Sequence, residues 1–348
     1  MIGKIKTVIE KFGLPRIIIF FFLITLFILA PIVGVRLDIS INDVIVRFGM
    51  NGILVLSLIP MVRSGCGLNF GLQLGVIAGL LGAVISIELN ATGFAGFFVA
   101  IAVSLFFALI LGFLYGILLN KVKGDEMVVA TYVGFSAVSF MCILWLLLPF
   151  KNPSIIWPYG GEGLRTTISN QDYWFNILTN FLQIKVGEYI VFPTGTILFF
   201  IFLTAIVWLF FRSKIGTAMI AVGSNPDFAK SCGVNVDNMR IISVVLSTVI
   251  AAIGIIVYQE SFGFIQLYMA PLYMPFPAIA ALLIGGATVG KASFENVIVG
   301  VFLFQGIITM TPSIINNIFK SDMSEVVRII VSNGMIVYAL TRITRGRS

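Results

Sequence analysis

Residues 212–240 read RSKIGTAMIAVGSNPDFAKSCGVNVDNMR, a polar segment that separates two long apolar runs. The middle of this segment carries the signals of a short helix. Asn225 is a favoured N-cap residue, and Pro226 suits the first helical position. Asp227 favours the positive end of the helix dipole, and Gly233 is typical of the left-handed residue that follows a helix. The pattern predicts one short helix between Asn225 and Gly233.

A helix over residues 226–232 would be only about 10 Å long at about 1.5 Å per residue. Isolated helices need about 12 residues or more, so this helix must pack against a partner. Phe228 is the evident anchor, because an aromatic side chain among small residues suits a pocket in a cytosolic protein. The residues alone leave a second interpretation equally open, in which the helix folds back on the membrane part of its own chain.

The composition around this segment is that of a membrane protein. Of 348 residues, 59% are hydrophobic and 11% are charged, whereas about a quarter of residues are charged in soluble domains. Apolar runs recur along the whole chain, which predicts an all-α integral membrane protein with about ten transmembrane helices. The predicted spans lie near 17–35, 44–62, 72–87, 93–119, 127–149, 193–211, 241–258, 275–290, 296–311 and 325–341. The third, eighth and ninth are shorter than a full crossing of about 20 residues, so we expect broken or partly re-entrant helices there.

The distribution of Lys and Arg predicts the orientation of these spans. With the N- and C-termini in the cytoplasm, most Lys and Arg residues outside the spans fall in cytoplasmic segments, as the positive-inside rule requires. This topology makes residues 1–348 a single transmembrane domain. It places residues 150–192 on the outer side of the membrane, as a loop with a small helix. It places residues 212–240 on the cytoplasmic side.

The sequence offers no catalytic constellation. It contains no histidine, and its three cysteines, Cys66, Cys142 and Cys232, are far apart, so the usual general base and zinc ligands are missing. Residues 285–293, GGATVGKAS, come close to a nucleotide-binding loop, but Ala292 stands where that loop needs Ser or Thr. We therefore expect no enzyme, no metal site and no cofactor in this chain. The net charge of +7 is dispersed, which predicts no nucleic-acid partner.

Residues 221–248, AVGSNPDFAKSCGVNVDNMRIISVVLST, resemble the coupling segment of ATP-binding-cassette (ABC) importer permeases of the ribose, galactose and nucleoside type. This binding-protein-dependent family is akin to the branched-chain amino acid permeases. Its pattern Gly-x-Asn-x-x-x-Ala-x-x-x-Gly-[Ile or Val]-Asn-Val precedes a membrane span. Every fixed position has a match here, at Gly223, Asn225, Ala229, Gly233, Val234, Asn235 and Val236. Residues 278–293 and 64–75 resemble two further family segments, although the second lacks the acidic residue of the sugar-type motif.

The resemblance implies a permease subunit of an ATP-driven importer that lies in the lipid bilayer of the cell membrane. It implies that a separate cytosolic ATPase subunit binds ATP and Mg²⁺, that a second permease subunit completes a dimer, and that an extracytoplasmic solute-binding protein delivers the solute. The coupling residues are then Gly223, Asn225, Pro226, Asp227, Phe228, Ala229, Lys230 and Gly233. The solute would be small and polar, a monosaccharide first and a nucleoside next. The alternative is a secondary transporter driven by an ion gradient, which usually keeps carboxylates or histidines within the membrane.

A permease needs a pathway of modest hydrogen-bonding capacity, so we expect its lining among polar and aromatic residues in or beside the spans. The candidates are Asn51, Asn69, Phe70, Gln73, Tyr132, Ser136, Gln259, Phe264, Gln266, Tyr268 and Asn316. Each has an alternative role in packing between helices or at the membrane interface. Glu88 and Glu260 fall at the outer boundary, where we expect them to be solvated. Two pairs of glycines lie four residues apart, Gly75 with Gly79 and Gly112 with Gly116. Each pair predicts a close contact with a neighbouring helix.

Overall fold

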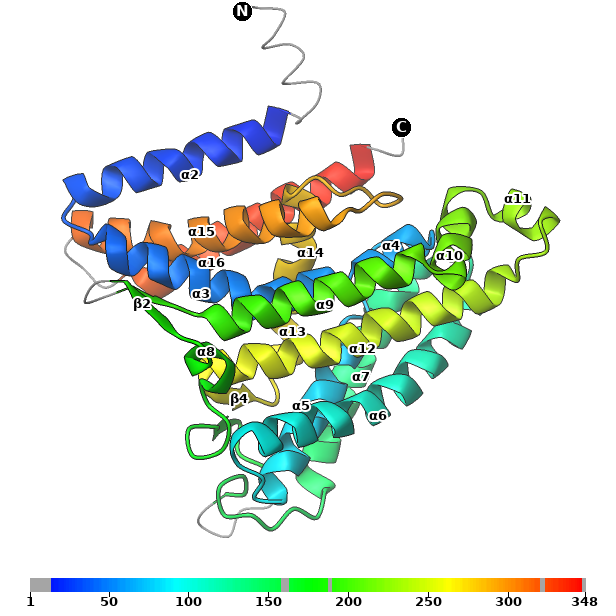
Figure 1. Ribbon diagram of the computed structural model, residues 1–348, viewed down its shortest axis with the longest axis horizontal. Coiled ribbons are helices and arrows are strands. Elements are labelled where there is room, and N and C mark those ends of the chain that lie inside the picture. Colours follow the sequence, from blue (N-terminus) through cyan, green and yellow to red (C-terminus); the bar gives the residue numbers. More distant parts are fainter. Residues whose placement is uncertain (1–13, 158–162, 187–189, 320–322, 346–348) are drawn as a thin grey trace, which may run out of the picture.

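Helices cross the molecule side by side, and short strands lie at one end (Figure 1). The computed structural model describes residues 14–157, 163–186, 190–319 and 323–345. The longer helices are α2 (Leu14–Ile32), α3 (Leu37–Leu56), α5 (Gln73–Glu88), α6 (Gly93–Lys121), α7 (Glu126–Leu147), α9 (Thr194–Arg212), α12 (Val236–Phe262), α15 (Phe294–Phe319) and α16 (Ser324–Arg345). The shorter helices are α4 (Ile59–Arg63), α8 (Ile177–Asn180), α10 (Lys214–Ser224), α11 (Pro226–Ser231), α13 (Ala270–Tyr273) and α14 (Pro275–Ile284). The strands are β1 (Thr167–Ser169), β2 (Ile184–Val186), β3 (Ile190–Phe192) and β4 (Phe264–Gln266).

The apolar helices confirm an all-α membrane protein. Within the described residues, seven helical segments are long and apolar enough to cross a bilayer, and three further apolar helices are shorter. The predicted short third span is α5, and the predicted eighth span, 275–290, is the ten-residue α14, which follows α13. The prediction of a short ninth span was wrong, because α15 has 26 residues and continues through Pro312. A proline is tolerated inside a membrane helix. Beside it the Ser313 hydroxyl donates to the Thr309 carbonyl over 3.3 Å.

The segment predicted as an outer loop contains more than a small helix. Strand β1 pairs antiparallel with β4, so that Ile168 lies opposite Ile265, and β2 pairs with β3 in a hairpin. The predicted small helix is the four-residue α8. These strands escaped prediction because each has three residues, and the partner of β1 lies far away in the sequence. The all-α class therefore holds for the membrane part, and two small ribbons are added at its end.

The helices α5, α6 and α12 form the centre of the bundle and pack closely at glycines. A Cβ added at Gly79 would lie 2.1 Å from Ile255 of α12, and one added at Gly75 would lie 2.5 Å from Ala251. On the other side of α12, a Cβ added at Gly112 of α6 would lie 3.0 Å from the Val245 Cα. The predicted close contacts are confirmed. They explain how α5 can be short, since it is buried by protein along most of its length.

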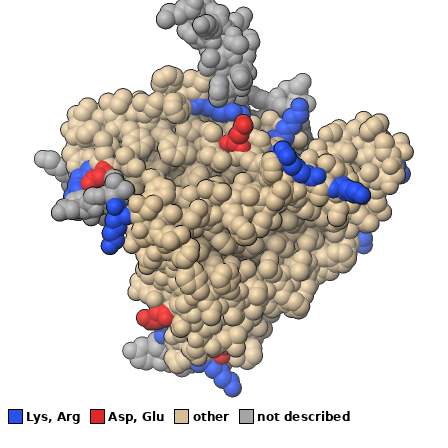
Figure 2. Space-filling model, in the orientation of Figure 1, with Lys and Arg blue, Asp and Glu red and all other residues tan. Residues whose placement is uncertain are grey.

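The two ends of the bundle differ in character. One end carries α10, α11 and the turn between α6 and α7, and we call it the α11 end; the other carries β1, β4 and α8, and we call it the β4 end (Figure 1). Figure 2 shows a broad surface without charged side chains between the charged margins of the molecule, as a lipid belt requires. Helix α2 begins at the α11 end, where the Arg16 side chain donates to the Gly286 carbonyl over 2.9 Å. The chain termini, predicted to be cytoplasmic, lie outside the described residues.

A methyl group at the centre of the bundle tests this packing. Gly79→Ala places its Cβ 2.1 Å from Ile255 and 2.6 Å from a backbone oxygen of α12, and overpacking of this kind costs about 1–3 kcal/mol. We expect a lower midpoint of thermal unfolding in detergent. Gly334→Ala in α16 is the control, because a Cβ there meets no atom within 4 Å. Equal midpoints for the two variants would contradict the close contact of α5 with α12.

Candidate coupling surface and solute pathway

Helix α11 has the caps that its sequence predicts. The Asn225 side-chain oxygen accepts a hydrogen bond from the Phe228 backbone N–H over 3.0 Å. At the other end Gly233 has a φ of 81°, and the Val234 N–H donates to the Ala229 carbonyl over 3.0 Å. This pattern is a Schellman motif, which satisfies carbonyls that a helix end leaves free. The helix is one residue shorter than predicted, and both predicted caps are confirmed.

The two faces of α11 differ sharply in exposure. Ala229 is 1% exposed, whereas Phe228 is 63% exposed. The Ala229 face therefore packs on the rest of the chain, whereas the Phe228 ring points outward. Folding back on the chain describes the first face, and an anchor for a cytosolic partner fits the second. Figure 1 places α11 at the extreme edge of the α11 end. A large apolar side chain at such a protruding edge is typical of an anchor for another protein.

Helix α10 precedes α11 and was missed by the sequence analysis. Its signal is a Ser213 N-cap, which accepts from the Gly216 N–H over 3.2 Å, followed by buried Met219 and Val222 three residues apart. The helix ends in a backbone contact with the chain that follows α4. A Cβ added at Gly223 would lie 2.0 Å from the Arg63 carbonyl oxygen. Only a residue without a side chain permits this approach, so α10 is held directly against the turn after α4.

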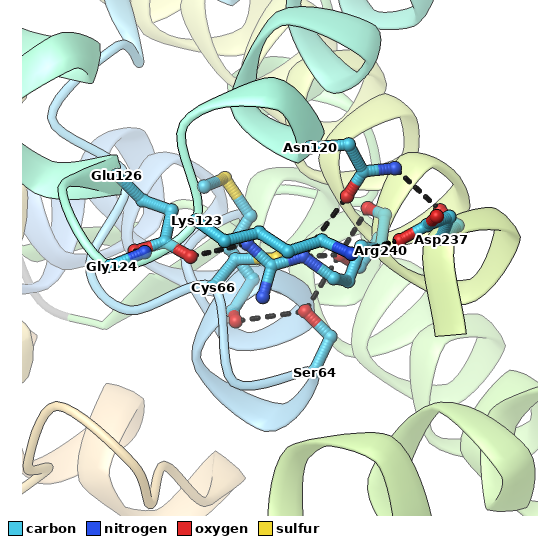
Figure 3. Close-up of polar contacts among 10 residues, drawn as sticks. Ser64, Cys66, Asn120, Lys123, Gly124, Glu126, Asp237 and Arg240 are labelled. Atoms are coloured by element: carbon cyan, nitrogen blue, oxygen red, sulfur yellow. Dashed lines mark hydrogen bonds and ion pairs between the residues drawn. The ribbon is translucent and has the colours of Figure 1, made fainter. Parts of the chain in front are cut away.

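A cluster of charged residues ties the start of α12 to the turn between α6 and α7 (Figure 3). Arg240 of α12 donates from Nε to Asn120 over 3.0 Å, and its guanidinium forms an ion pair with Glu126. The side chains of this pair are only 9% and 14% exposed. Lys123 pairs with Asp237 nearby, but these two side chains are 49% and 57% exposed. The segment that follows α11 is thus held to α7 by a nearly buried ion pair.

The backbone between α4 and α5 is irregular and largely buried. Irregular backbone at membrane depth needs surrounding protein or a water-filled cavity. Asn69, a predicted pathway residue, is enclosed in this turn: its amide donates to Ser247 of α12 over 2.9 Å, and its oxygen accepts from Gly71 N–H and the Tyr115 hydroxyl over 3.0 and 3.1 Å. Asn69 therefore joins α5, α6 and α12, in agreement with its alternative role in packing.

Gln73 lies four residues later and differs from Asn69 in its hydrogen bonding. Its side chain is fully buried, and among the described residues neither Nε2 nor Oε1 has a hydrogen-bond partner. The amide lies directly against Gly134 of α7, where an added Cβ would be 2.5 Å from Oε1. Leaving a buried polar group without a partner costs about 1–3 kcal/mol. A side chain that retains this cost is a candidate for contact with a solute.

Three aromatic rings link the chain just before Gln73 to α7 next to Gly134. The Phe70 ring lies 6.5 Å from that of Phe276 in α14, which in turn lies 6.1 Å from that of Phe135 in α7. Tyr132 and Ser136 are exposed on the same face of α7 as Phe135, since residues three and four apart share a helix face. Tyr132 and Ser136 stand two residues on either side of Gly134, so they face away from Gln73 and outward from the bundle. Of the predicted pathway residues, only Asn69 and Phe70 lie close to Gln73 in the chain.

The other predicted pathway residues lie elsewhere. Asn51 donates to the Arg47 carbonyl of its own helix, and Asn316 accepts from the Met323 N–H near the β4 end. The remaining four belong to the β4 end, namely Gln259, Phe264, Gln266 and Tyr268. Of these, Gln259 has a buried amide without a partner among the described residues. Phe264 and Gln266 flank the buried Ile265 on β4, so they share the outward face of the β1–β4 ribbon.

Glu260 is not solvated, contrary to prediction. Its side chain is fully buried, and Oε1 accepts from the backbone N–H groups of Leu178 and Thr179 at the start of α8 over 2.9 and 3.2 Å. A carboxylate at the N-terminus of a helix is stabilised by the free N–H groups there. Sequence position alone suggested the outer boundary, but the partner helix α8 covers this carboxylate. Glu88 accepts from the N–H groups of residues 151 and 152 in a comparable way.

Residues 285–293, which come close to a nucleotide-binding loop, form a turn between α14 and α15. A nucleotide-binding loop follows a β-strand and opens a helix, whereas this segment follows the helix α14. Gly286 has a φ of 92°, and the Thr288 N–H donates to the Lys291 carbonyl over 2.8 Å. Gly286 therefore serves a tight turn.

Comparison with known proteins agrees with this geometry. A family model described as the permease component of the branched-chain amino acid transport system matches residues 40–340. The chain belongs to this family. It is 27% identical over 292 residues to the autoinducer 2 import system permease protein LsrC of Yersinia pestis (strain Pestoides F). The aligned region covers 82% of this chain and 74% of that protein. LsrC of Photorhabdus laumondii subsp. laumondii is 26% identical over 272 residues, with coverage of 77% and 73%.

No solved structure gives a significant match to the chain. The family membership and the apolar helices together make this chain a multi-pass membrane permease of the ABC importer type, as the coupling segment predicted.

The charged cluster can be tested by breaking its two ion pairs separately. Arg240→Met leaves the nearly buried Glu126 without its partner, and such a loss costs about 3–5 kcal/mol. Lys123→Met removes a partner from the exposed pair with Asp237, for which about 0–1 kcal/mol is expected. Thermal unfolding in detergent should therefore show a clear loss of stability for Arg240→Met and little change for Lys123→Met. The reverse order would contradict the assigned roles.

Proposed function

We propose that this permease moves a small polar solute inward and is driven by a separate cytosolic ATPase subunit that docks on α11. The observation that carries the proposal is the exposed Phe228 ring on a capped helix, which is held to the bundle on both sides. Before α11, Gly223 contacts the backbone after α4. After α11, Arg240 is paired with Glu126 of α7. A push on α11 therefore reaches two parts of the membrane bundle.

Both connections end beside the irregular turn between α4 and α5. The Gly223 backbone touches Gly65, where an added Cβ would lie 3.1 Å from the Gly223 Cα. Ser243, one turn after Arg240 on α12, contacts the Ser64 hydroxyl over 2.7 Å. The same turn continues into Asn69 and Gln73. We infer that closure of the ATPase dimer tilts α12 and shifts this turn, which changes the access of the pathway.

This proposal includes an orientation and partners. The α11 end, with residues 212–240, faces the cytoplasm, and residues 150–192 face outward, where the β1–β4 ribbon offers Phe264 and Gln266 to a solute-binding protein. ATP and Mg²⁺ belong to the ATPase subunit. A second permease subunit covers the exposed face of α7 that carries Tyr132 and Ser136. The name of the relatives, an import system permease protein, supports the inward direction.

The solute is a monosaccharide first and a nucleoside next, because neutral amide and aromatic side chains meet on the pathway side of the bundle. The alternative function is a secondary transporter driven by an ion gradient. The buried carboxylates argue against it: Glu260 is engaged by backbone N–H groups of α8, and Glu126 is paired with Arg240. Both carboxylates are thus engaged within the protein, whereas a secondary transporter needs a membrane carboxylate that faces the path of the ion. Solute movement by the purified chain alone in liposomes under an ion gradient would favour the alternative.

The proposed docking role of Phe228 leads to a direct test. Tagged protein is purified from detergent-solubilised membranes, and the copurifying ATPase subunit is quantified. Phe228→Ala should reduce its recovery by at least tenfold, because buried aromatic anchors contribute about 2 kcal/mol or more to an interface. The matched control is Phe106→Ala in α6, whose side chain is 62% exposed but lies on the apolar surface of a long membrane helix.

Three outcomes are decisive for the docking proposal. Recovery of the ATPase with wild type and with Phe106→Ala, but not with Phe228→Ala, supports docking on α11. Equal recovery with both variants contradicts the role of Phe228. A folded wild-type protein that brings down no ATPase contradicts the importer proposal itself.

A further inference from the structure

Two buried amides, one in the turn before α5 and one at the first residue of α5, differ in one respect. The Asn69 amide is hydrogen-bonded to Ser247, Gly71 and Tyr115, whereas Gln73 has no hydrogen-bond partner among the described residues. We propose that the Gln73 amide is a hydrogen-bonding subsite for a ring hydroxyl of the transported solute, with the Phe70, Phe276 and Phe135 rings as its apolar wall. The inference rests on the proposed function and names a contact within its pathway.

The chemistry of the subsite selects a class of solute. A primary amide offers donors on Nε2 and an acceptor on Oε1, and a hydroxyl group is both donor and acceptor, so two neighbouring hydroxyls can bind both polar atoms of the amide. Three phenylalanine rings in sequence, with centroids 6.5 and 6.1 Å apart, suit the C–H face of a ring. The amide and the rings are uncharged. The fitting solute is therefore a neutral ring with vicinal hydroxyls, a feature shared by monosaccharides and nucleosides.

The position of Gln73 fits a site that opens only during transport. The side chain has no exposed surface in this conformation, so a solute can reach it only when the surrounding helices move. Gly134, which touches the amide, lies about 12 Å along α7 from Glu126 at about 1.5 Å per residue. The site is therefore inside the apolar span of α7. It is also in the segment that the connections from α11 reach first, so a movement of α11 would expose it.

The absence of a side chain at Gly134 makes room for the amide. An added Cβ would lie 2.5 Å from Oε1, 2.7 Å from Cδ and 3.1 Å from Nε2 of Gln73. In Gly134→Ala the end of the flexible Gln73 side chain must therefore move. If the amide serves the solute, Gly134→Ala impairs transport through Gln73 alone. The double variant Gly134→Ala with Gln73→Leu is then no worse than Gln73→Leu, because both changes act on one contact.

The first experiment measures access to position 73 without knowledge of the solute. Cys66, Cys142 and Cys232 are replaced by serine, and Gln73→Cys is compared with Gln305→Cys, since Gln305 is a buried glutamine of α15 outside the site. The purified complex with its ATPase is labelled with N-ethylmaleimide at rest and after trapping with ATP and vanadate. We expect the Gln73→Cys labelling rate to differ at least tenfold between the two states, with Gln305→Cys unlabelled in both. An unlabelled Gln73→Cys in both states, in a complex that hydrolyses ATP, overturns the proposal.

The second experiment measures uptake into cells of labelled D-ribose, uridine and L-leucine. Gln73→Leu should lower the uptake of the hydroxylated probe at least tenfold without lowering the thermal midpoint or the recovery of the ATPase, because it removes a buried amide that has no partner. Gln305→Leu should leave the uptake and the recovery of the ATPase unchanged. Wild-type uptake of L-leucine without either hydroxylated probe overturns the assigned class. Loss of ATPase recovery or folding in Gln73→Leu assigns the residue a structural role and also overturns the subsite.

The two proposals fail in different ways. If wild-type protein brings down no ATPase, the proposed function fails, and the subsite is then tested alone by the protection of the Gln73→Cys thiol with excess D-ribose or uridine. A thiol that is unlabelled, or that neither probe protects, overturns the subsite as well.

Discussion

The turn between α4 and α5 depends on the protein that surrounds it, because a membrane interior offers no water to irregular backbone. Serines of α12, the Tyr115 hydroxyl of α6 and the backbone of α10 supply that surrounding. The close packing of α5 against α12 at Gly75 and Gly79 holds these partners in place. A short central helix, a broken backbone and a buried amide can coexist within the membrane part only because of this enclosure.

The same enclosure links the exposed helix α11 to the interior. The chain on one side of α11 ends in a contact between two glycine backbones, and the chain on the other side begins with the Arg240–Glu126 pair. Both contacts resist a sliding movement of α11 against the bundle. The two glycine backbones touch directly, and separation of Arg240 from Glu126 would leave a nearly buried charge without its partner. A rigid connection from a protruding aromatic anchor to the turn that holds Gln73 is what an ATP-driven permease requires of its structure.

The sequence predicted those features that depend on neighbours along the chain. The caps of α11, the glycine contacts of α5 and α6, and the short eighth span follow from local residue types and are confirmed. The length of α15 was wrongly predicted because the helix continues through Pro312. The burial of Glu260 was wrongly predicted because α8 covers the carboxylate and supplies its partners. Among the pathway candidates, no local signal distinguishes Asn69 from Gln73. Both are amides in the same glycine-rich segment, and only their surroundings differ.

The sequence by itself therefore determined the class of molecule and the capped helix α11. Apolar content and length define membrane helices, and a cap or a left-handed glycine acts within a few residues. Only the tertiary structure decided which buried polar groups have a hydrogen-bond partner, since that partner can come from any helix that packs alongside. Ser247 and Tyr115 reach Asn69 from distant parts of the chain, whereas Gly134 places only a bare backbone against Gln73.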